Sequence, residues 1–428
     1  MLKSLKGRLA AIRYADILKA SILSFLVRIF GALAGFVATF FIARSLGAEE
    51  SGYYFLAFSV ISILAAASRL GMDNTLIRFV GADHAQGGGV LVKAVFASGV
   101  FSLFTAFLLF ISSGFLANSI FHKPDLAPVL AGMSLGVSGL ALFTLSASAL
   151  QGLHRVVASI FILNISVNLL LILAVLSGFA LKADALARFY SVAAMLTALT
   201  GMALFWWFKP KASTAAVPWN VIWASCLPLW AVMIMSQMVQ WSGQFIAGAY
   251  VSSELVAQLA VAQRTAMLAS FVLIAVNLVV APRFAALHRQ GDIAGLESLA
   301  ILSVKLIGVL ALPVIGVMLI FPSWLMGLFG EGFAGGSQLL QILAVGQFIN
   351  AITGSVGYLL MMSGHERDMR NVTLISGSTA LGLTWLLTIA FGATGNAVGT
   401  AIAVATQNLL AVYFVKKRLG FNTLAVWR

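Results

Sequence analysis

The chain is poor in the residues on which redox proteins, metalloproteins and nucleotide hydrolases depend. Cys226 is the only cysteine in 428 residues, which excludes an intramolecular disulfide and a CxxC metal site. The five histidines are far apart in the sequence and show no metal-ligand spacing. A GxxxxGK[ST] phosphate-binding loop is also missing. The sequence therefore indicates no metal and no cofactor.

Charge is scarce as well, and apolar residues take its place. Only 9% of the residues are charged, 61% are hydrophobic, and the mean hydropathy is +1.03 along the whole chain. This composition predicts a polytopic membrane protein without a detachable soluble domain. At about 20 apolar residues per crossing, twelve spans are predicted. They are Ser21–Ala43, Gly52–Leu70, Val90–Ala117, Ala127–Leu150, Val156–Phe179, Ala187–Phe208, Val221–Val251, Val256–Ala281, Leu299–Phe321, Ser337–Ser363, Asn371–Phe391 and Asn396–Val415.

The basic residues predict how the chain is oriented. The net charge of +13 would suggest a nucleic-acid partner in a soluble protein, but here the Lys and Arg residues cluster in short segments between apolar runs. Placing both termini in the cytoplasm assigns 20 of the 26 Lys and Arg residues to inside segments, as the positive-inside rule requires. The first apolar run lacks a small-residue cleavage site and is interpreted as a retained span. We expect a bacterial inner-membrane protein without a nucleic-acid partner.

An internal repeat divides the chain near its middle. Phe41-Ile42-Ala43 with Glu50 recurs about 204 residues later as Phe245-Ile246-Ala247 with Glu254. Six spans of equal orientation in each half make a parallel repeat, with an axis along the membrane normal and a cavity between the halves. The predicted fold is an all-α membrane protein of two six-helix lobes. The lobes are residues 1–208 and 221–428, joined by a cytoplasmic linker at 209–220.

Three arginines are candidates for binding an anion. Arg28 lies about 12 Å into the first span at 1.5 Å per residue, in a stretch without an acidic residue. Arg264 lies at a similar depth in the eighth span, and Arg69 closes the second. A cation inside the membrane is costly and indicates a functional partner. The alternatives are that Arg28 snorkels to the interface and that Arg69 is an interfacial residue paired with Asp73.

Polar side chains recur on single helix faces and are candidates for binding sugars. In the seventh span these residues are Gln237, Gln240, Trp241 and Gln244; in the tenth they are Gln347, Asn350 and Tyr358. Spacings of three and four place each set on one face. Amides and an indole suit hydroxyl-rich ligands. The alternative interpretation is hydrogen bonding between helices, which is common in membrane bundles.

Two segments resemble a known family. The stretch FLVRIFGALAGFVATFFIARSLGAEESGYYFLAFSVISILAAASRLGMDNTLIRFVG, within Ile22–Gln86, resembles the start of the polysaccharide transport family, the O-antigen-type oligosaccharide-lipid flippases. The segment AQRTAMLASFVLIAVNLVVAPRFAALHRQGDIAGLESL, Ala262–Leu299, resembles its second-half signature. This resemblance implies a MATE-like fold of the multidrug/oligosaccharidyl-lipid/polysaccharide exporter superfamily.

The resemblance extends to the arginines. Peptidoglycan-precursor flippases of that superfamily have intramembrane arginines in their first, second and eighth helices, and Arg28, Arg69 and Arg264 resemble them in position. By resemblance, these three would hold a diphosphate. Those flippases typically have fourteen helices rather than twelve, which disfavours a peptidoglycan substrate.

The sequence thus predicts a transporter rather than an enzyme. It would flip an undecaprenyl-diphosphate-linked oligosaccharide to the periplasmic leaflet, with membrane lipids and polysaccharide polymerase machinery as partners. One alternative is a cation-coupled multidrug exporter, which should have carboxylates inside its spans; no centrally placed Asp or Glu is found there. The other is a polysaccharide polymerase or ligase, which needs an extended external loop, whereas the longest external connection is Pro322–Gly336.

Overall fold

The protein is helical throughout the residues that the computed structural model describes, which are 2–83, 87–178, 181–209 and 217–425. Side chains are described in these ranges except for residues 2–25, 28, 228–229 and 232. The first half contains α1 (Leu2–Ser68), α2 (Met72–Ala82), α3 (Gly87–Phe115), η1 (Leu116–Ile120), α4 (Leu126–Met133), α5 (Gly136–Gly152), α6 (Val156–Ile160), η2 (Phe161–Ser166), α7 (Val167–Leu176) and α8 (Ala183–Phe208). The second half contains α9 (Trp219–Tyr250), α10 (Ser253–Ala266), η3 (Met267–Ala269), α11 (Ser270–Gln290), α12 (Ile293–Ile320), α13 (Pro322–Gly327), η4 (Glu331–Gly336), α14 (Ser337–Thr353), α15 (Val356–Met362) and α16 (Glu366–Leu419).

Among the described residues, eight helices are long and apolar enough to cross a membrane, or nine if one bent pair is a single span, and two of these helices each contain two of the predicted spans. The chain turns back inside α1 at Gly47 and inside α16 at Gly392, where φ is 77° and 60°. Glycine adopts such positive φ values without a steric penalty. The tenth span is a bent pair, α14 with η4 before it and α15 after it, at an angle of 43°. Apolar segments of this length form helices in lipid because each backbone group must be paired within the segment.

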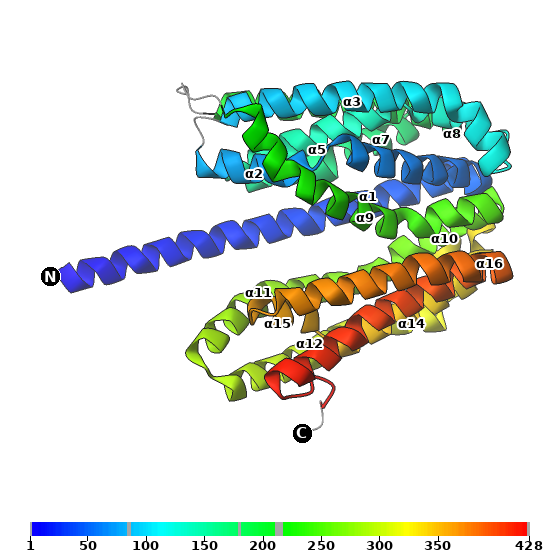
Figure 1. Ribbon diagram of the computed structural model, residues 1–428. Coiled ribbons are helices and arrows are strands. Elements are labelled where there is room, and N and C mark those ends of the chain that lie inside the picture. Colours follow the sequence, from blue (N-terminus) through cyan, green and yellow to red (C-terminus); the bar gives the residue numbers. More distant parts are fainter. Residues whose placement is uncertain (1, 84–86, 179–180, 210–216, 426–428) are drawn as a thin grey trace.

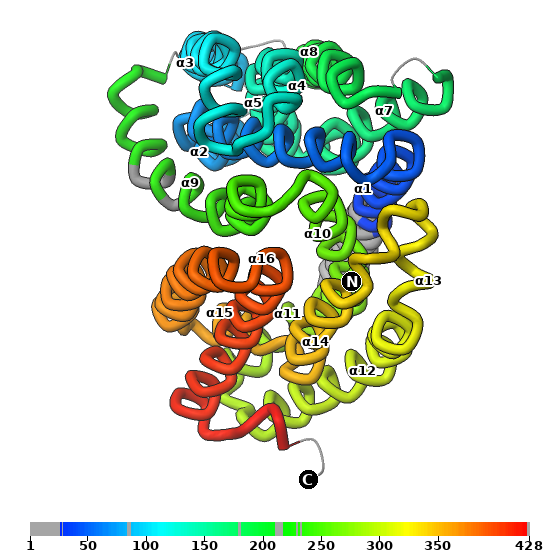
Figure 2. Tube along the Cα trace, turned by 90° about the vertical axis from the view of Figure 1, so that its right-hand side faces the viewer, coloured from blue at the N-terminus to red at the C-terminus, as the bar shows by residue number. Residues whose placement is uncertain are grey.

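The helices form two lobes that lie one above the other (Figure 1). Helices α1 to α8 make the N-terminal lobe, in which α5 packs against α8 and α3. Helices α10 to α16 make the C-terminal lobe, in which α14 packs against α16 and α12. Figure 2 shows α9 and α10 at the seam between the two lobes. The fold is therefore the predicted two-lobed helical membrane fold.

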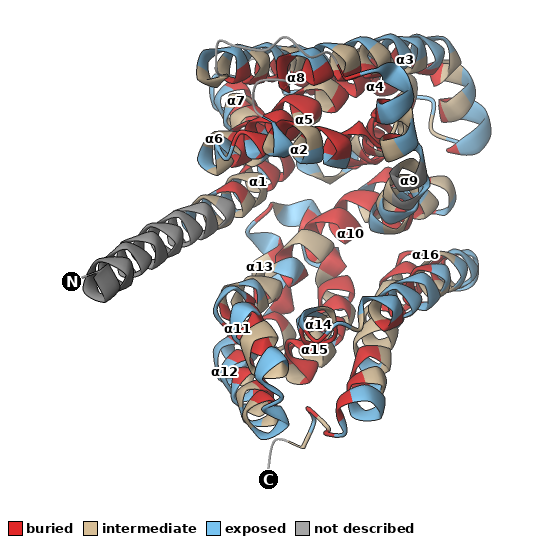
Figure 3. Cartoon of the chain, turned by 60° about the vertical axis from the view of Figure 1, so that its left-hand side comes forward, coloured by how far each residue is buried: buried red, intermediate tan, exposed pale blue. Residues whose placement is uncertain are grey.

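The surface of the lobes is apolar, as expected for contact with lipid. Large side chains of α3 such as Phe96, Phe107 and Phe115 are exposed, whereas the interior holds small, aliphatic and aromatic side chains. Figure 3 shows buried residues on the inner faces of α4, α5 and α8 and exposed residues on the outer helices. With lipid as the solvent, this outward apolar surface carries no penalty.

The lobes are joined at the end of the molecule opposite the chain termini, which we call the distal end; the other is the terminal end (Figure 1). Arg44 Nη1 donates to the Leu328 carbonyl over 3.0 Å, and Lys123 Nζ donates to the Gly248 carbonyl over 2.5 Å. Gly52 lies so close to the backbone of Ser253 that a Cβ atom would collide with it. The distal end is therefore closed.

Helix α9 contacts both lobes. Near its start, Trp230 Nε1 donates to the Ala67 carbonyl over 2.8 Å, which fixes it to the N-terminal lobe. Near its end, the Gly243 carbonyl accepts from Asn396 Nδ2 of α16 over 2.9 Å. The predicted linker at 209–220 largely coincides with residues 210–216, which lie outside the described residues.

Candidate functional site

A cavity of about 500 Å³ lies between α1, α5, α7 and α8 of the N-terminal lobe and α9 and α10 at the seam. Its polar lining residues are Thr39, Tyr54, Ser62, Arg69, Asp73, Thr144, Asn164, Asn168, Tyr190, Gln237, Gln240, Trp241 and Arg264. Tyr54 and Arg69 are 15 residues apart along one helical arm, about 22 Å at 1.5 Å per residue. The cavity therefore extends through much of one span, away from the closed distal end.

Arg264 reaches the cavity from α10 and is held there by α1. Its Nη1 donates to the Thr39 hydroxyl, and the guanidinium carbon lies 4.8 Å from the centroid of the Phe55 ring. Among the described residues, Arg264 makes no ion pair with a carboxylate. A guanidinium with an oriented fork of donors and no acidic partner is suited to binding phosphate.

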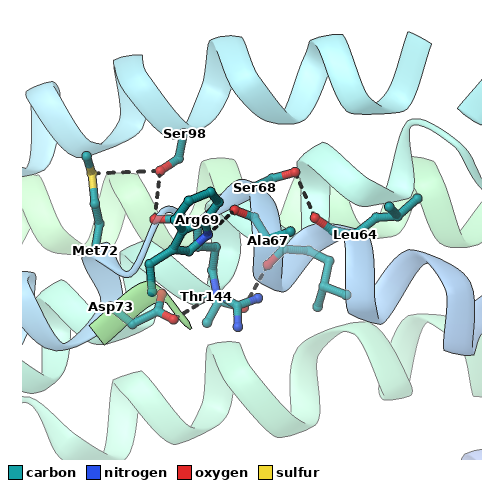
Figure 4. A network of polar contacts seen from close by, with 10 residues as sticks. Leu64, Ala67, Ser68, Arg69, Met72, Asp73, Ser98 and Thr144 are labelled. Carbon is teal, nitrogen blue, oxygen red and sulfur yellow. Dashed lines mark hydrogen bonds and ion pairs between the residues drawn. The ribbon is translucent and has the colours of Figure 1, made fainter. Parts of the chain in front are cut away.

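Arg69 also lines the cavity, but it has an acidic partner. Its Nε lies 2.8 Å from Asp73 Oδ2, and both side chains are only 7% exposed (Figure 4). The two residues lie at a helix break, since α1 ends at Ser68 and α2 begins at Met72, with Leu70 and Gly71 at positive φ. The alternative interpretation of Arg69, a pair with Asp73, is thereby confirmed. Asp73 lies beyond the predicted end of the second span at Leu70, and helix α2 continues that span and brings the carboxylate into the cavity wall.

The side chain of Arg28 lies outside the described residues, so its predicted contact with an anion stays a prediction. The backbone of Arg28 belongs to α1, whose glycines lie against the fifth span. A Cβ atom on Gly31 would meet Asn164 Cβ at 2.6 Å, and one on Gly35 would lie 3.6 Å from Asn168 Nδ2. These glycines allow α1 to approach the two asparagines of the cavity wall closely.

The polar residues predicted on α9 divide between two environments. Gln237, Gln240 and Trp241 line the cavity, and Trp241 Nε1 donates to Gln237 Oε1 over 3.0 Å. Gln244 is buried outside the cavity lining, and its Oε1 has no hydrogen-bond partner among the described residues.

The polar residues predicted on the tenth span lie apart from this cavity. Gln347 Oε1 accepts from the Ser270 hydroxyl over 2.6 Å and from Asn350 Nδ2 over 3.3 Å. These contacts agree with the alternative interpretation of the polar residues of the tenth span, which is hydrogen bonding between helices and along one helix. Tyr358 is 42% exposed and is not among the lining residues either.

Aromatic rings form one wall of the cavity, which the sequence did not predict. The Phe58 ring stands edge-on to the Tyr190 and Trp241 rings at centroid distances of 5.5 and 5.3 Å, and all three line the cavity. Tyr54 adds a further aromatic ring to the lining. Aromatic residues inside apolar runs look the same whether they face lipid or a cavity, so the pattern gave no signal.

The site thus combines a cationic group, amides and aromatic faces in one chamber within the membrane. Anion binding and contact with hydroxyl-rich groups are the chemistry available to it. The fold and this chamber define a polytopic membrane protein of the two-lobed transporter type.

Known proteins agree with this class. The chain matches the family "Polysaccharide biosynthesis protein" over residues 17–288 and belongs to that family. It is 25% identical over 415 residues to a probable low-salt glycan biosynthesis flippase, Agl15, of the archaeon Haloferax volcanii, covering 94% of this chain and 84% of the relative.

Solved structures show the same fold at low identity. An inward-facing multidrug resistance MATE family transporter of the MOP superfamily superposes with a TM-score of 0.72 at 16% identity, over 94% of this chain and 98% of that one. The lipid II flippase MurJ in an inward closed conformation superposes with a TM-score of 0.73 at 13% identity, over 92% and 87%. The MATE-like fold expected from the resemblance is confirmed.

Proposed function

We propose that this protein flips a lipid-linked oligosaccharide across the membrane, and that the lipid carrier is undecaprenyl diphosphate. The observation that carries the proposal is Arg264, which faces the chamber without a carboxylate partner among the described residues. A cation held in this way inside a membrane is stabilised when an anion enters. The similarity to a glycan biosynthesis flippase supports the same class of substrate.

The lining suggests how the substrate is held. The diphosphate would contact Arg264, with Arg28 and Arg69 as further cations, while the sugars lie against the amides of Gln237 and Gln240 and the Trp241 ring. The polyprenyl chain would stay in the bilayer. Because amides and aromatic faces tolerate many hydroxyl patterns, the chamber suits a family of glycans.

The closed distal end supports a direction of transport. With both termini in the cytoplasm, the distal end is periplasmic, and the described conformation receives substrate from the cytoplasmic side. Rocking of the lobes would then open the distal end. A negative interior favours outward movement of an anion by about 2.3 kcal/mol per charge per 100 mV. We propose the bacterial inner membrane as the location and the polymerase that extends the glycan as a partner.

The charge of the chamber argues against the drug-export alternative. Asp73 is a carboxylate of the kind that such an exporter needs, but Arg69 neutralises it and Arg264 leaves the described groups with a net positive charge. A cationic drug would be repelled. A polymerase or ligase would need an extended external loop, whereas the longest predicted external connection, residues 322–336, consists mostly of the short helices α13 and η4.

The proposal is tested by reconstituting the purified protein in liposomes with labelled diphosphate-linked oligosaccharides of several sugar compositions. We expect flipping by the wild type and a loss of about 30-fold or more in Arg264→Ala, because removing one partner of a buried charge contact costs about 2–5 kcal/mol. Arg28→Ala is tested in parallel.

Arg289→Ala is the matched control, because Arg289 is an exposed arginine outside the cavity and should leave flipping unchanged. Normal flipping by both Arg28→Ala and Arg264→Ala would overturn the anion site. Failure of the wild type with every glycan, together with export of cationic dyes, would overturn the proposed function in favour of drug export.

A further inference from the structure

Asp73 is incompletely satisfied although it is buried. Its Oδ2 contacts Arg69 Nε, while Oδ1 has no hydrogen-bond partner among the described residues. Burying a carboxylate costs free energy unless its oxygens are paired. The single contact between Arg69 and Asp73 can therefore be replaced by a contact of Arg69 with another anion.

The other two ion pairs of the described residues show what is unusual here. Arg418 binds Asp368 through two nitrogens, at 2.7 and 3.1 Å. Arg188 and Asp184 have the same spacing of four residues as Arg69 and Asp73, but their side chains are 67% and 32% exposed. Only the pair in the cavity combines a single contact with deep burial.

Few other ionisable groups lie around Asp73. Helix α2 packs against α3, α5 and α9. Helix α5 has no ionisable residue. Helix α3 has Lys93, which donates to the Val217 carbonyl, and α9 has Cys226 and, as its last residue, Tyr250. On α2 itself Arg78 is exposed, and across the cavity the ionisable side chains described are Tyr54, Tyr190 and Arg264. Arg69 is thus the one cation in direct contact with Asp73 in this part of the structure.

We propose that Asp73 competes with the diphosphate of the substrate for Arg69 and takes up a proton from water when it is displaced. The inference rests on the proposed function. It assigns Asp73 the role of a positioning residue that holds Arg69 until substrate arrives. One proton moves from solvent to a carboxylate oxygen, and no other bond changes.

The loss of its cation explains why Asp73 needs a proton. While Arg69 contacts Oδ2, the buried carboxylate has an opposite charge beside it. When the diphosphate takes Arg69, Asp73 is left as a buried carboxylate with no described cation in contact with it. An unpaired buried carboxylate is strongly disfavoured, and a proton neutralises it.

The test is calorimetric titration of the detergent-solubilised full chain with a short-chain prenyl diphosphate linked to one hexose, at mildly acidic pH. The two phosphate protons of this probe are lost at far lower pH, so its own charge stays constant. Titrations in two buffers of different ionisation enthalpy give the number of protons bound. We expect uptake approaching one proton per lipid, and binding that tightens as the pH falls.

Asp73→Asn removes the competing charge, so proton uptake should vanish and the probe should bind about tenfold tighter. Asp184→Asn, in the exposed pair with the same spacing, is the matched control and should behave as the wild type. Binding by the wild type without proton uptake, or binding that depends on sodium instead, would overturn the inference even if Asp73→Asn fails to fold. Those results would not contradict the proposed function, which is contradicted only if the protein does not flip the lipid in liposomes.

Discussion

Arg264 of α10 donates to the hydroxyl of Thr39 in α1, so that one hydrogen bond joins the first span to the eighth across the seam. The same hydroxyl donates its own proton to the Gly35 carbonyl over 2.8 Å, which leaves its lone pairs to face the guanidinium. Thr39 is fully buried. The direction of Arg264 is therefore set by a residue of the opposite lobe.

Replacing Thr39 by Val should misdirect Arg264 without removing it. The loss of a hydrogen bond to a charged group costs about 1.5–3 kcal/mol, so we expect the apparent affinity for the lipid to fall by about tenfold or more. The measurement is the concentration dependence of flipping in liposomes. Thr39→Ser keeps the hydroxyl and should restore most of the affinity. An unchanged affinity in Thr39→Val would show that Arg264 finds its direction without this bond.

The fold was predictable from the sequence because the bilayer imposes a simple rule. Apolar runs long enough to cross must be helices, and the repeat of Phe41-Ile42-Ala43 as Phe245-Ile246-Ala247 divides them into two halves. The all-α architecture follows and is confirmed by the structure and its relatives. Gly47 and Gly392 have non-helical backbone angles, and at each the chain turns from one span into the next.

The cavity could be predicted only in part. A cation in an apolar span is a strong signal, and Arg264 does line the cavity. The pairing of Arg69 with Asp73 was the alternative interpretation of Arg69 and follows from their nearness in the sequence. The place of Asp73 in the cavity lining was not predicted, because helix α2, which carries it, continues beyond the predicted end of the span at Leu70. Gln347 was predicted to line the cavity, but its side chain contacts Ser270 of α11 instead. A polar face on a helix has the same sequence pattern whether it faces a cavity or a neighbouring helix.

Trp241→Phe should separate sugar binding from diphosphate binding. The substitution keeps an aromatic ring beside Phe58 but removes the indole N–H that donates to Gln237 Oε1. Gln237 is then free to turn, and the amide no longer presents a fixed set of donors to the sugar. We expect affinity for the glycan-bearing lipid to fall by about fivefold, the value of one ordinary hydrogen bond. Affinity for the sugar-free prenyl diphosphate should not change, and equal losses for both lipids would contradict the assignment of Trp241 to the sugar.

Gly52→Ala should weaken closure of the distal end. The new methyl group would meet the backbone of Ser253, which cannot give way as a flexible side chain would. Overpacking of this kind costs about 1–3 kcal/mol, so the ratio of closed to open molecules should fall by about tenfold. The reporter is the cysteine pair Ala48→Cys and Gly332→Cys in a Cys226→Ser background. A Cβ atom on Gly332 would lie 3.1 Å from Ala48 Cβ, close enough for a disulfide in the closed state.

The yield of that disulfide should fall in Gly52→Ala and stay constant in Gly114→Ala. Gly114 is the matched control, because no atom lies within 4 Å of its added Cβ. A high yield in Gly52→Ala would mean that the backbone of Ser253 shifts aside and that this contact does not hold the lobes together.

Lys123→Met should loosen the same end by a smaller amount. Lys123 lies in the loop between η1 and α4, and its Nζ reaches the Gly248 carbonyl near the end of α9. Burial lowers the pKa of the Lys123 ammonium group, so its desolvation offsets part of the hydrogen bond. We expect a net loss of about 1 kcal/mol, which is about fivefold in the ratio of closed to open molecules, and a correspondingly lower yield of the same disulfide. The exposed Lys182 supplies the control, Lys182→Met, which should change nothing.

The lowered pKa of Lys123 also predicts how closure depends on pH. The closed state binds the Lys123 proton more weakly than an open state in which the side chain is hydrated, so closure releases protons. Raising the pH toward the ordinary range of a lysine pKa should therefore favour the closed state, because the neutral amine still donates to the Gly248 carbonyl. Accessibility of a single cysteine at Ala48→Cys to a water-soluble maleimide, corrected for its own pH dependence, should decrease with pH in the Cys226→Ser background. In Lys123→Met this decrease should be absent, and a decrease of equal size there would assign the pH dependence to another group.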